Sequence, residues 1–280
     1  MTSSPTLVFC HANGFPGGTY GALFEAWRAA GWRVLAPDKL GHDPAHPPTS
    51  GWPHLRDELI AFIEKKAGGR PVALVGHSMG GYLSLLVASR RPQLVSAVVL
   101  LDSPIVAGWR APTFGLLKLT GLIQRGGPGK ISVRRREHWP SREAAREHFA
   151  AKPAFARWDS RVLDDYIAHG FVPDKAHGGV RLAYRREIET RIYNTLPHHV
   201  GPLLRRHPVR CPVGFIAGRQ STENLQLGLA FVRQLAGQRW RWMEGSHLFP
   251  MERPQETAQT VMALLEANAA PTRGALVMVA

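Results

Sequence analysis

The chain has 280 residues, of which 44% are hydrophobic and 20% are charged. This length and composition exclude a globally disordered chain and suit one large folded domain, or a domain that carries an insertion. Its 35 Lys and Arg residues outnumber its 21 Asp and Glu residues, for a net charge of +14, and residues 103–210 hold 20 of the basic and 9 of the acidic ones.

Apolar, strand-like runs alternate with amphipathic helical stretches over the first hundred residues. Strands are predicted at 6–10, 32–38, 71–76 and 95–101, and helices at 19–31, 52–69 and 78–91. The strands are apolar almost throughout, which is typical of a parallel sheet with helices on both faces. The sequence therefore predicts an α/β fold.

The alternation stops at Asp102, and up to about residue 207 there are helical pieces and no convincing strand. Afterwards the pattern resumes with strands at 212–217 and 239–244 and helices at 223–237 and 253–269. We therefore expect an α/β core of residues 1–102 and 208–270, interrupted by an inserted helical cap at 103–207. The apolar tail, residues 271–280, has no predicted place.

Residues 76–80, Gly-His-Ser-Met-Gly, form a G-x-S-x-G motif between a predicted strand and a predicted helix. At such a turn the serine is held in a strained backbone conformation with its hydroxyl exposed, and the glycines leave room for neighbouring backbone. The N–H of Met79, at the start of the helix, points toward charge that develops on a substrate oxygen. Ser78 is therefore the candidate nucleophile and Met79 a candidate oxyanion donor. An ordinary tight turn is the alternative.

Two further segments complete the pattern expected for such a nucleophile. His247 lies between the last predicted strand and the last predicted helix. A neutral imidazole there can take the serine proton and return it to the leaving group. The loop after the first strand, residues 11–18, is expected to supply a second oxyanion N–H. Phe15 is the first choice for that donor, with Ala12 or Asn13 as alternatives.

These motifs together resemble those of the α/β-hydrolase superfamily. "HANGFPGGTY" resembles the family's HG-x-P loop with two extra residues, "LVGHSMGGYLSL" is similar to its nucleophile elbow, and "GSHLFPMERP" is similar to its histidine loop. The resemblance implies a capped serine hydrolase, esterase-like or lipase-like, that uses no cofactor and no metal. The β-hairpin that often precedes the first strand in the family is missing, so about six mostly parallel strands are expected. Haloalkane dehalogenases and capped epoxide hydrolases share this architecture but use an aspartate, so Ser78 implies acyl transfer instead.

The carboxylate that should orient His247 is missing from its usual place. In the family it usually follows the strand that leads to Gly218, and the matching position holds Ser221, which carries no charge. Asp102 is our first choice, because a subset of the family places its acid just past this earlier strand. Glu223, two residues past Ser221, is the alternative acid, because its side chain is long enough to be expected to reach the histidine, and a dyad or an inactive site stays open.

The predicted cap combines aromatic residues, which suit the roof of an acyl pocket, with a basic run. Arg134–Arg136, with Arg142 and Arg146, would attract an anionic substrate, although the same pattern fits a solvated helix face with Glu–Arg pairs. The basic residues are scattered and no recognition motif is found, so nucleic acid is not expected as a partner. The histidines of "PHHVGPLLRRHP" lack nearby carboxylates, so no metal site is predicted there.

Cys10 and Cys211 are too few for a disulfide framework and have no metal-ligand spacing, so both are predicted to be free thiols. The N-terminus lacks the features of a signal peptide, and no apolar run reaches the roughly 20 residues that cross a bilayer. We therefore expect a cytoplasmic protein with no membrane span.

The predicted function is hydrolysis of a carboxylic ester, or a related acyl bond, of a small molecule through an acyl-enzyme. Thioester hydrolysis, C–C bond hydrolysis of an anionic diketone and acyl transfer to another acceptor stay open as alternatives within the fold. The alternative from another class is a non-catalytic relative that binds a small ligand, because the usual acid is missing.

Overall fold

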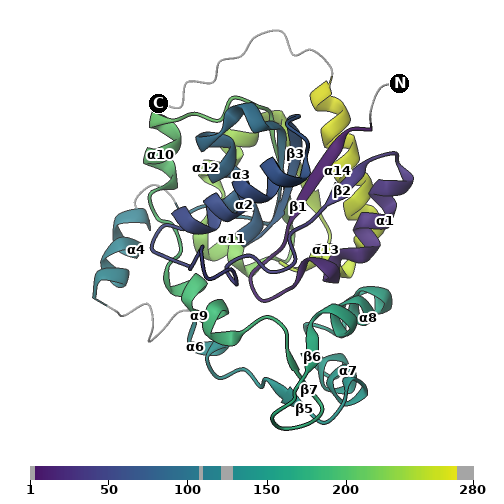
Figure 1. Ribbon diagram of the computed structural model, residues 1–280. Coiled ribbons are helices and arrows are strands. Elements are labelled where there is room, and N and C mark those ends of the chain that lie inside the picture. Colours follow the sequence, from purple (N-terminus) through teal and green to yellow (C-terminus); the bar gives the residue numbers. More distant parts are fainter. Residues whose placement is uncertain (1–3, 107–109, 121–128, 270–280) are drawn as a thin grey trace.

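A computed structural model of the protein describes residues 4–106, 110–120 and 129–269. Its core is one six-stranded, fully parallel sheet in the order β2-β1-β3-β4-β8-β9 (Figure 1), which confirms the predicted α/β fold and strand number. The strands are β1 Thr6–Cys10, β2 Arg33–Leu35, β3 Val72–His77, β4 Val95–Leu101, β8 Val213–Gly218 and β9 Trp240–Met243.

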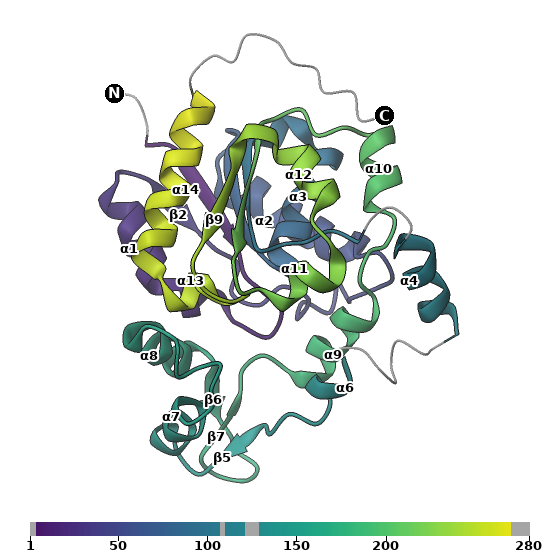
Figure 2. The same cartoon turned by 180° about the vertical axis from the view of Figure 1, so that it is seen from behind.

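Helices cover both faces of the sheet, and alternate residues of each strand face opposite layers. Leu7 and Phe9 of β1 pack in one apolar cluster with α1 and α14, whereas Val8 and Cys10 pack in the other with α2, α3 and α12. Figures 1 and 2 show these helices on either side of the strands. Their bounds are α1 Gly21–Ala29, α2 Pro53–Lys66, α3 Met79–Arg90, α12 Ala230–Ala236 and α14 Pro254–Ala269.

Residues 103–207, which we call the inserted segment, lie between β4 and β8 in the chain. Residues 138–182 of this segment form a lobe at one end of the core, whereas residues 200–206 pack on the core beside α12 (Figure 1). The helices of the inserted segment are α4 Arg110–Leu119, α6 Gly129–Ser132, α7 Arg142–Ala150, α8 Ser160–His169, α9 Arg186–Asn194 and α10 Val200–Arg206. Contrary to the expectation of no strand there, it also holds a three-stranded antiparallel sheet. These strands are β5 His138–Trp139, β6 Phe171–Pro173 and β7 Val180–Leu182. Strands of two or three residues are too short to show an alternating pattern.

The remaining elements differ from prediction only in detail. The helix predicted at 223–237 is two helices, α11 Thr222–Leu227 and α12, separated at Gly228, whose φ of 81° a helix cannot accommodate. Short helices also form at α13 Phe249–Glu252, η1 Gly17–Tyr20, η2 Pro92–Leu94 and η3 Gly237–Arg239. Cys10 and Cys211 are free thiols, buried and partly buried respectively. Within the described ranges, no helix has the length and apolar character needed to span a bilayer. The tail, 271–280, lies outside the described residues.

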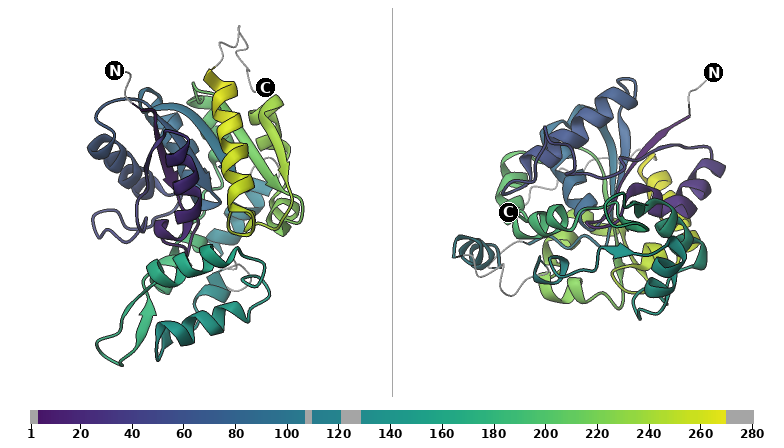
Figure 3. Two further views of the ribbon diagram at one scale, coloured as in Figure 1. Left: turned by 90° about the vertical axis from the view of Figure 1, so that its right-hand side faces the viewer. Right: turned by 60° about the horizontal axis from the view of Figure 1, so that its bottom comes forward.

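The parallel arrangement brings the predicted site residues to one edge of the sheet. Phe15, Ser78, Asp102, Ser221 and His247 each follow the carboxyl end of a different strand, namely β1, β3, β4, β8 and β9. Ligands of open α/β sheets bind at this edge. The lobe formed by residues 138–182 lies against the same edge (Figures 1 and 3).

Candidate active site

Ser78 occupies the tight turn between β3 and α3, whose first residue is Met79. Its backbone angles, φ 52° and ψ −114°, are strained for a residue with a side chain. The flanking glycines are needed for close packing. A Cβ on Gly80 would lie 1.9 Å from the Cys10 carbonyl oxygen, and one on Gly76 would lie 2.3 Å from the carbonyl of Gly80. The G-x-S-x-G spacing thus follows from a corner where two strands and a helix approach each other.

Asp102 lies beside the nucleophile turn, because it follows β4 and the preceding residue, Leu101, pairs with His77 of β3. Its side chain is fully buried, and its Oδ2 accepts a hydrogen bond of 2.7 Å from Nδ1 of His247. His247 comes from the loop after β9, 145 residues further along the chain. The fold therefore brings the first-choice acid and the candidate base into direct contact.

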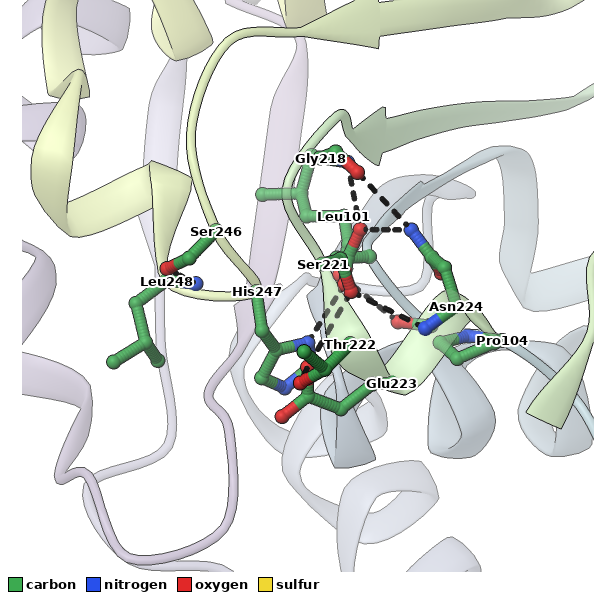
Figure 4. A network of polar contacts seen from close by, with 12 residues as sticks. Leu101, Pro104, Gly218, Ser221, Thr222, Glu223, Asn224, Ser246, His247 and Leu248 are labelled. Atoms are coloured by element: carbon green, nitrogen blue, oxygen red, sulfur yellow. Dashed lines mark hydrogen bonds and ion pairs between the residues drawn. The ribbon is translucent and has the colours of Figure 1, made fainter. Parts of the chain in front are cut away.

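Three more donors surround the Asp102 carboxylate. Its Oδ1 accepts from the Gly218 N–H and from Nδ2 of Asn224, both at 2.7 Å. Its Oδ2 accepts from the Ser221 hydroxyl at 2.5 Å in addition to His247. Figure 4 shows Gly218, Ser221, Asn224 and His247 gathered in this network. Ser221, at the position where the family usually carries an acid, therefore donates to the carboxylate of the neighbouring strand. Sequence reasoning missed this role of Ser221 and Asn224.

The contact between Asp102 and His247 shifts the pKa of both groups. Burial alone would raise the pKa of the Asp102 carboxyl, but the bond from His247, its charge, and the Ser221 and Gly218 donors lower it below its ordinary value. Burial acts to lower the pKa of His247, but its bond with Asp102 and the nearby negative charge raise it above its ordinary 6.5. The site therefore favours an ionised carboxylate beside an imidazole that gains a proton readily.

Glu223, the alternative acid, lies in the same cluster. Carboxylate oxygens of Glu223 and Asp102 and a ring nitrogen of His247 lie within 4.8 Å of one another. Glu223 Oε2 accepts a hydrogen bond from the Thr222 hydroxyl at 3.1 Å and lies 3.4 Å from the Ser221 hydroxyl oxygen, whose proton is donated to Asp102. Within the described part of the chain, no hydrogen bond joins Glu223 to His247. Glu223 thus acts on the imidazole through charge at short range, whereas Asp102 contacts it directly.

A buried chain of hydrogen bonds ties the loops of the site together. The Ala12 N–H donates to the Tyr20 hydroxyl at 3.2 Å, and that hydroxyl lies 2.8 Å from Nδ1 of His77. Nε2 of His77 lies 2.9 Å from the His247 carbonyl oxygen, to which it donates. Burial lowers the pKa of His77 to about 3, and the charge of nearby His247 acts in the same direction, so the ring is neutral and one nitrogen donates while the other accepts. Sequence reasoning also missed this positioning role of Tyr20 and His77.

Ser78 and His247 are held at the same corner by this chain, since His77 is the neighbour of Ser78 and contacts the His247 backbone. The two imidazole rings of His77 and His247 have centroids 5.1 Å apart. Among the described residues, no hydrogen bond reaches the Ser78 hydroxyl itself. Such bonds are often long or absent without a substrate and form in the complex.

The two candidate oxyanion donors differ in their present partners. Met79 is the first residue of α3, so its N–H has no acceptor within the helix. The Phe15 N–H donates to the Ala12 carbonyl at 3.2 Å within the loop after β1. The Ala12 N–H, the alternative donor, is bonded to Tyr20.

Aromatic residues of the inserted segment pack onto the loop after β1. The ring centroids of Phe155, Trp158 and Tyr166 lie 6.5, 5.6 and 5.8 Å from that of Phe15. Asn13, two residues earlier, donates from Nδ2 to a carbonyl of α9 at 2.9 Å. The inserted segment therefore contributes an apolar wall and a polar anchor beside the candidate oxyanion donors.

The basic residues singled out in the inserted segment mostly have partners within it. Arg135 is paired with Glu189 at 2.9 Å and donates to the Tyr166 hydroxyl at 2.7 Å. Arg146 is paired with Asp164 at 2.7 Å. Arg142 donates to the carbonyls of Ile167, Ala168 and Phe171, at the end of α8 and the start of β6. These partners favour the interpretation that the basic run is largely structural.

The alpha/beta hydrolase family model matches residues 7–260. The chain belongs to this family. Abhydrolase domain-containing protein AFT2-1 of Alternaria alternata is 31% identical over 234 residues, which cover 70% of this chain and 84% of that protein. The sn-1-specific diacylglycerol lipase ABHD11 of Mus musculus is 34% identical over 104 residues, which cover 36% of this chain and 34% of that protein.

Solved structures agree on the fold. An E-2-(acetamidomethylene)succinate hydrolase superposes with a TM-score of 0.72 and 19% identity, covering 94% of this chain and 91% of that one. A thioesterase domain from the curacin biosynthetic pathway superposes with a TM-score of 0.69 and 21% identity, covering 92% and 91%. These solved structures therefore show the fold, whereas membership of the family rests on the family model and on the Alternaria relative.

Proposed function

We propose that the protein is a serine hydrolase that cleaves a carboxylic ester, or a related acyl bond, of a small molecule. One observation carries the proposal: the 2.7 Å hydrogen bond between His247 and Asp102 lies beside the turn that presents Ser78. A hydroxyl, an imidazole and a carboxylate at one sheet edge are the groups that acyl transfer through a covalent intermediate requires. We assign Ser78 as nucleophile, His247 as general base and acid, and Asp102 as the orienting carboxylate.

In the proposed reaction, Ser78 Oγ attacks the substrate carbonyl carbon while its proton passes to Nε2 of His247. Asp102, bonded to Nδ1, stabilises the imidazolium, and the N–H groups of Met79 and Phe15 bind the oxyanion. His247 then returns the proton to the leaving alkoxide, which departs as an alcohol and leaves the acyl group on Ser78. A water molecule that gives its proton to His247 attacks this ester, and the acid and free Ser78 are released.

The proposed second oxyanion donor has to give up or share its present bond. The Phe15 N–H lies 3.2 Å from the Ala12 carbonyl, at the long end of the range for an N–H···O bond. A substrate oxyanion is a stronger acceptor than a neutral carbonyl, so the exchange is favourable when charge develops. Losing one donor of this kind typically costs about 100- to 1000-fold in turnover.

We further propose that the inserted segment, residues 103–207, is the cap of the active site and that its aromatic residues contact the acyl group. The packing of Trp158 and Tyr166 on Phe15 supports this arrangement. Because Arg135 and Arg146 are paired with carboxylates, we favour an uncharged, apolar acyl group over the anionic one that the basic run suggested. The lipase name of the mouse relative agrees with such a substrate.

The proposal is tested with a fluorophosphonate probe, which labels activated serines. The wild-type protein and the control Ser96→Ala, which changes an exposed serine of β4, should be labelled, and Ser78→Ala should not. A folded wild-type protein that is not labelled would support the non-catalytic alternative and overturn the proposal. Turnover of p-nitrophenyl esters of graded chain length, measured beside a coenzyme A thioester, then identifies the acyl class.

A further inference from the structure

A second cluster of ionisable side chains lies in the small sheet of the inserted segment, whose strand order is β5-β7-β6. Asp174 follows β6, His177 lies in the turn between β6 and β7, and His138 begins β5. Nδ1 of His138 lies 2.6 Å and Nδ1 of His177 lies 3.1 Å from the same oxygen, Oδ2 of Asp174. The sheet therefore directs two imidazoles and one carboxylate at a single point.

The carboxylate of this cluster is held in place by the turn itself. Oδ1 of Asp174 accepts from the N–H of Ala176 at 3.1 Å and that of His177 at 3.4 Å. The Asp174 N–H donates to the Gly179 carbonyl at 3.0 Å, which closes the turn. Only 4% of the Asp174 side chain is exposed. The rigid turn thus leaves Oδ2 aimed at the two imidazoles.

A carboxylate oxygen that lies between two imidazole nitrogens is part of a ligand set suited to a divalent transition-metal ion.

An outer carboxylate completes the arrangement around His138. Its other ring nitrogen, Nε2, lies 3.3 Å from Oε1 of Glu137. Glu137 is itself fixed by Arg186, whose Nε lies 2.9 Å from Oε2. Metal-binding histidines commonly donate their second ring N–H to a carboxylate, which fixes the ring and raises its basicity.

We propose that His138, Asp174 and His177 bind one divalent transition-metal ion of the zinc type. Two imidazoles and a carboxylate are ligands that Zn²⁺ accepts, whereas Mg²⁺ and Ca²⁺ prefer oxygen ligands throughout. Tetrahedral coordination at about 2.0–2.1 Å places ligand atoms roughly 3.3 Å apart. Relative to Oδ2 of Asp174, Nδ1 of His138 would therefore move outward from 2.6 Å by about 0.7 Å, and Nδ1 of His177 from 3.1 Å by about 0.2 Å. The His138 and His177 side chains are 43% and 71% exposed, so the ion enters from solvent and water completes its coordination.

The site lies in the small sheet rather than at the edge that carries Ser78 (Figure 1), so its role is structural. The ion would join the turn between β6 and β7 to β5, strands whose ladders are only two or three residues long. Sequence reasoning predicted no metal site, because His138 and Asp174 are 36 residues apart and no short spacing links them. The inference does not depend on the proposed function of Ser78.

The test is titration of chelator-treated, full-length protein with Zn²⁺ in a calorimeter, with Mg²⁺ in parallel. We expect one saturable Zn²⁺ site, no comparable Mg²⁺ binding, and a higher Tm with Zn²⁺. His177→Ala should abolish the site without unfolding the protein, because this side chain is largely exposed. Glu137→Gln, which alters only the outer carboxylate, should weaken binding by about 10- to 100-fold.

A matched control removes two exposed histidines elsewhere, in the variant His54→Ala/His207→Ala, and should bind Zn²⁺ like the wild type. A wild-type protein without saturable Zn²⁺ binding would overturn the proposal. Zn²⁺ binding that is unchanged in the single variants His138→Ala and His177→Ala would also overturn it. The same holds if the control variant loses binding as much as these two variants do. Because ester turnover is not the readout, failure here is distinguishable from failure of the serine hydrolase assignment.

Discussion

Replacing Asp102 by asparagine removes one charge and keeps the shape of the side chain. The amide oxygen can retain the bonds from the Gly218 N–H and Asn224 Nδ2. The amide NH₂ then faces Nδ1 of His247. In the wild type, the carboxylate oxygen at this position accepts a hydrogen bond from the Nδ1–H group. A donor at this point pairs only with an unprotonated Nδ1, so the imidazole proton moves to Nε2. In that tautomer Nε2 cannot accept the Ser78 proton.

The expected loss in kcat for Asp102→Asn is on the order of 10⁴-fold. The protein should still fold. Two charge-assisted bonds to Oδ2, from His247 at 2.7 Å and Ser221 at 2.5 Å, become neutral ones. At about 1 kcal/mol lost per bond, the free energy of unfolding should fall by about 2 kcal/mol. This is a minority of the roughly 5–15 kcal/mol that stabilises a typical folded protein.

The assay compares steady-state hydrolysis of a p-nitrophenyl ester with urea unfolding for Asp102→Asn and for the control Glu223→Gln. Glu223 has no hydrogen bond with His247 among the described residues, so its neutralisation should cost far less turnover. A larger loss in Glu223→Gln than in Asp102→Asn would refute the assignment of the acid. A loss in Asp102→Asn that is fully explained by unfolding would refute the tautomer argument.

Three other predictions follow from the same contacts. Turnover should fall as pH drops through the pKa of His247, because only the neutral imidazole accepts the serine proton. This pKa is raised above 6.5, so a midpoint clearly below 6.5 in a pH–rate profile would contradict the prediction. The hydrogen bond between protonated His247 and Asp102 also stabilises the folded state. The contribution of the imidazole to the free energy of unfolding is fully present below pH 6.5, and it is lost as pH rises through the raised pKa of His247. Tyr20→Phe removes the donor to buried His77 and should cost about 1–3 kcal/mol in urea unfolding, with slower turnover; unchanged values refute the hydrogen-bonded chain. Gly80→Ala would place a Cβ 1.9 Å from a backbone oxygen, so the free energy of unfolding should fall by about 3 kcal/mol and probe labelling should be lost; a fully active, stable variant contradicts the packing of the turn.

The core strands could be predicted because each has a recognisable pattern in its own stretch of sequence. β1, β3 and β4 are apolar over five to seven residues, and Ser78 lies between glycines whose missing Cβ atoms the packing requires. The strands of the inserted segment have no such pattern. β5, for example, has only two residues, and its extended conformation is stabilised by pairing with β7 rather than by its own sequence. The Asp174 cluster was missed for the same reason, since its members meet only after β5, β6 and β7 have paired.

The position of the acid depends on geometry rather than on a particular strand. β4 and β8 are adjacent and parallel, so the residues that follow them reach the same point beside His247. Asp102 reaches it from β4 with a φ of 43°, a conformation that a buried residue keeps only where its contacts repay the strain. Ser221 follows β8 and supplies one of those contacts as a hydrogen-bond donor. A carboxylate at Ser221 would face that of Asp102 across about one hydrogen-bond length, and two buried like charges there would repel, so this site accommodates a single acid. In the proposed mechanism, moving the charge to β4 therefore requires a neutral donor at the β8 position, and Ser221 fits that requirement.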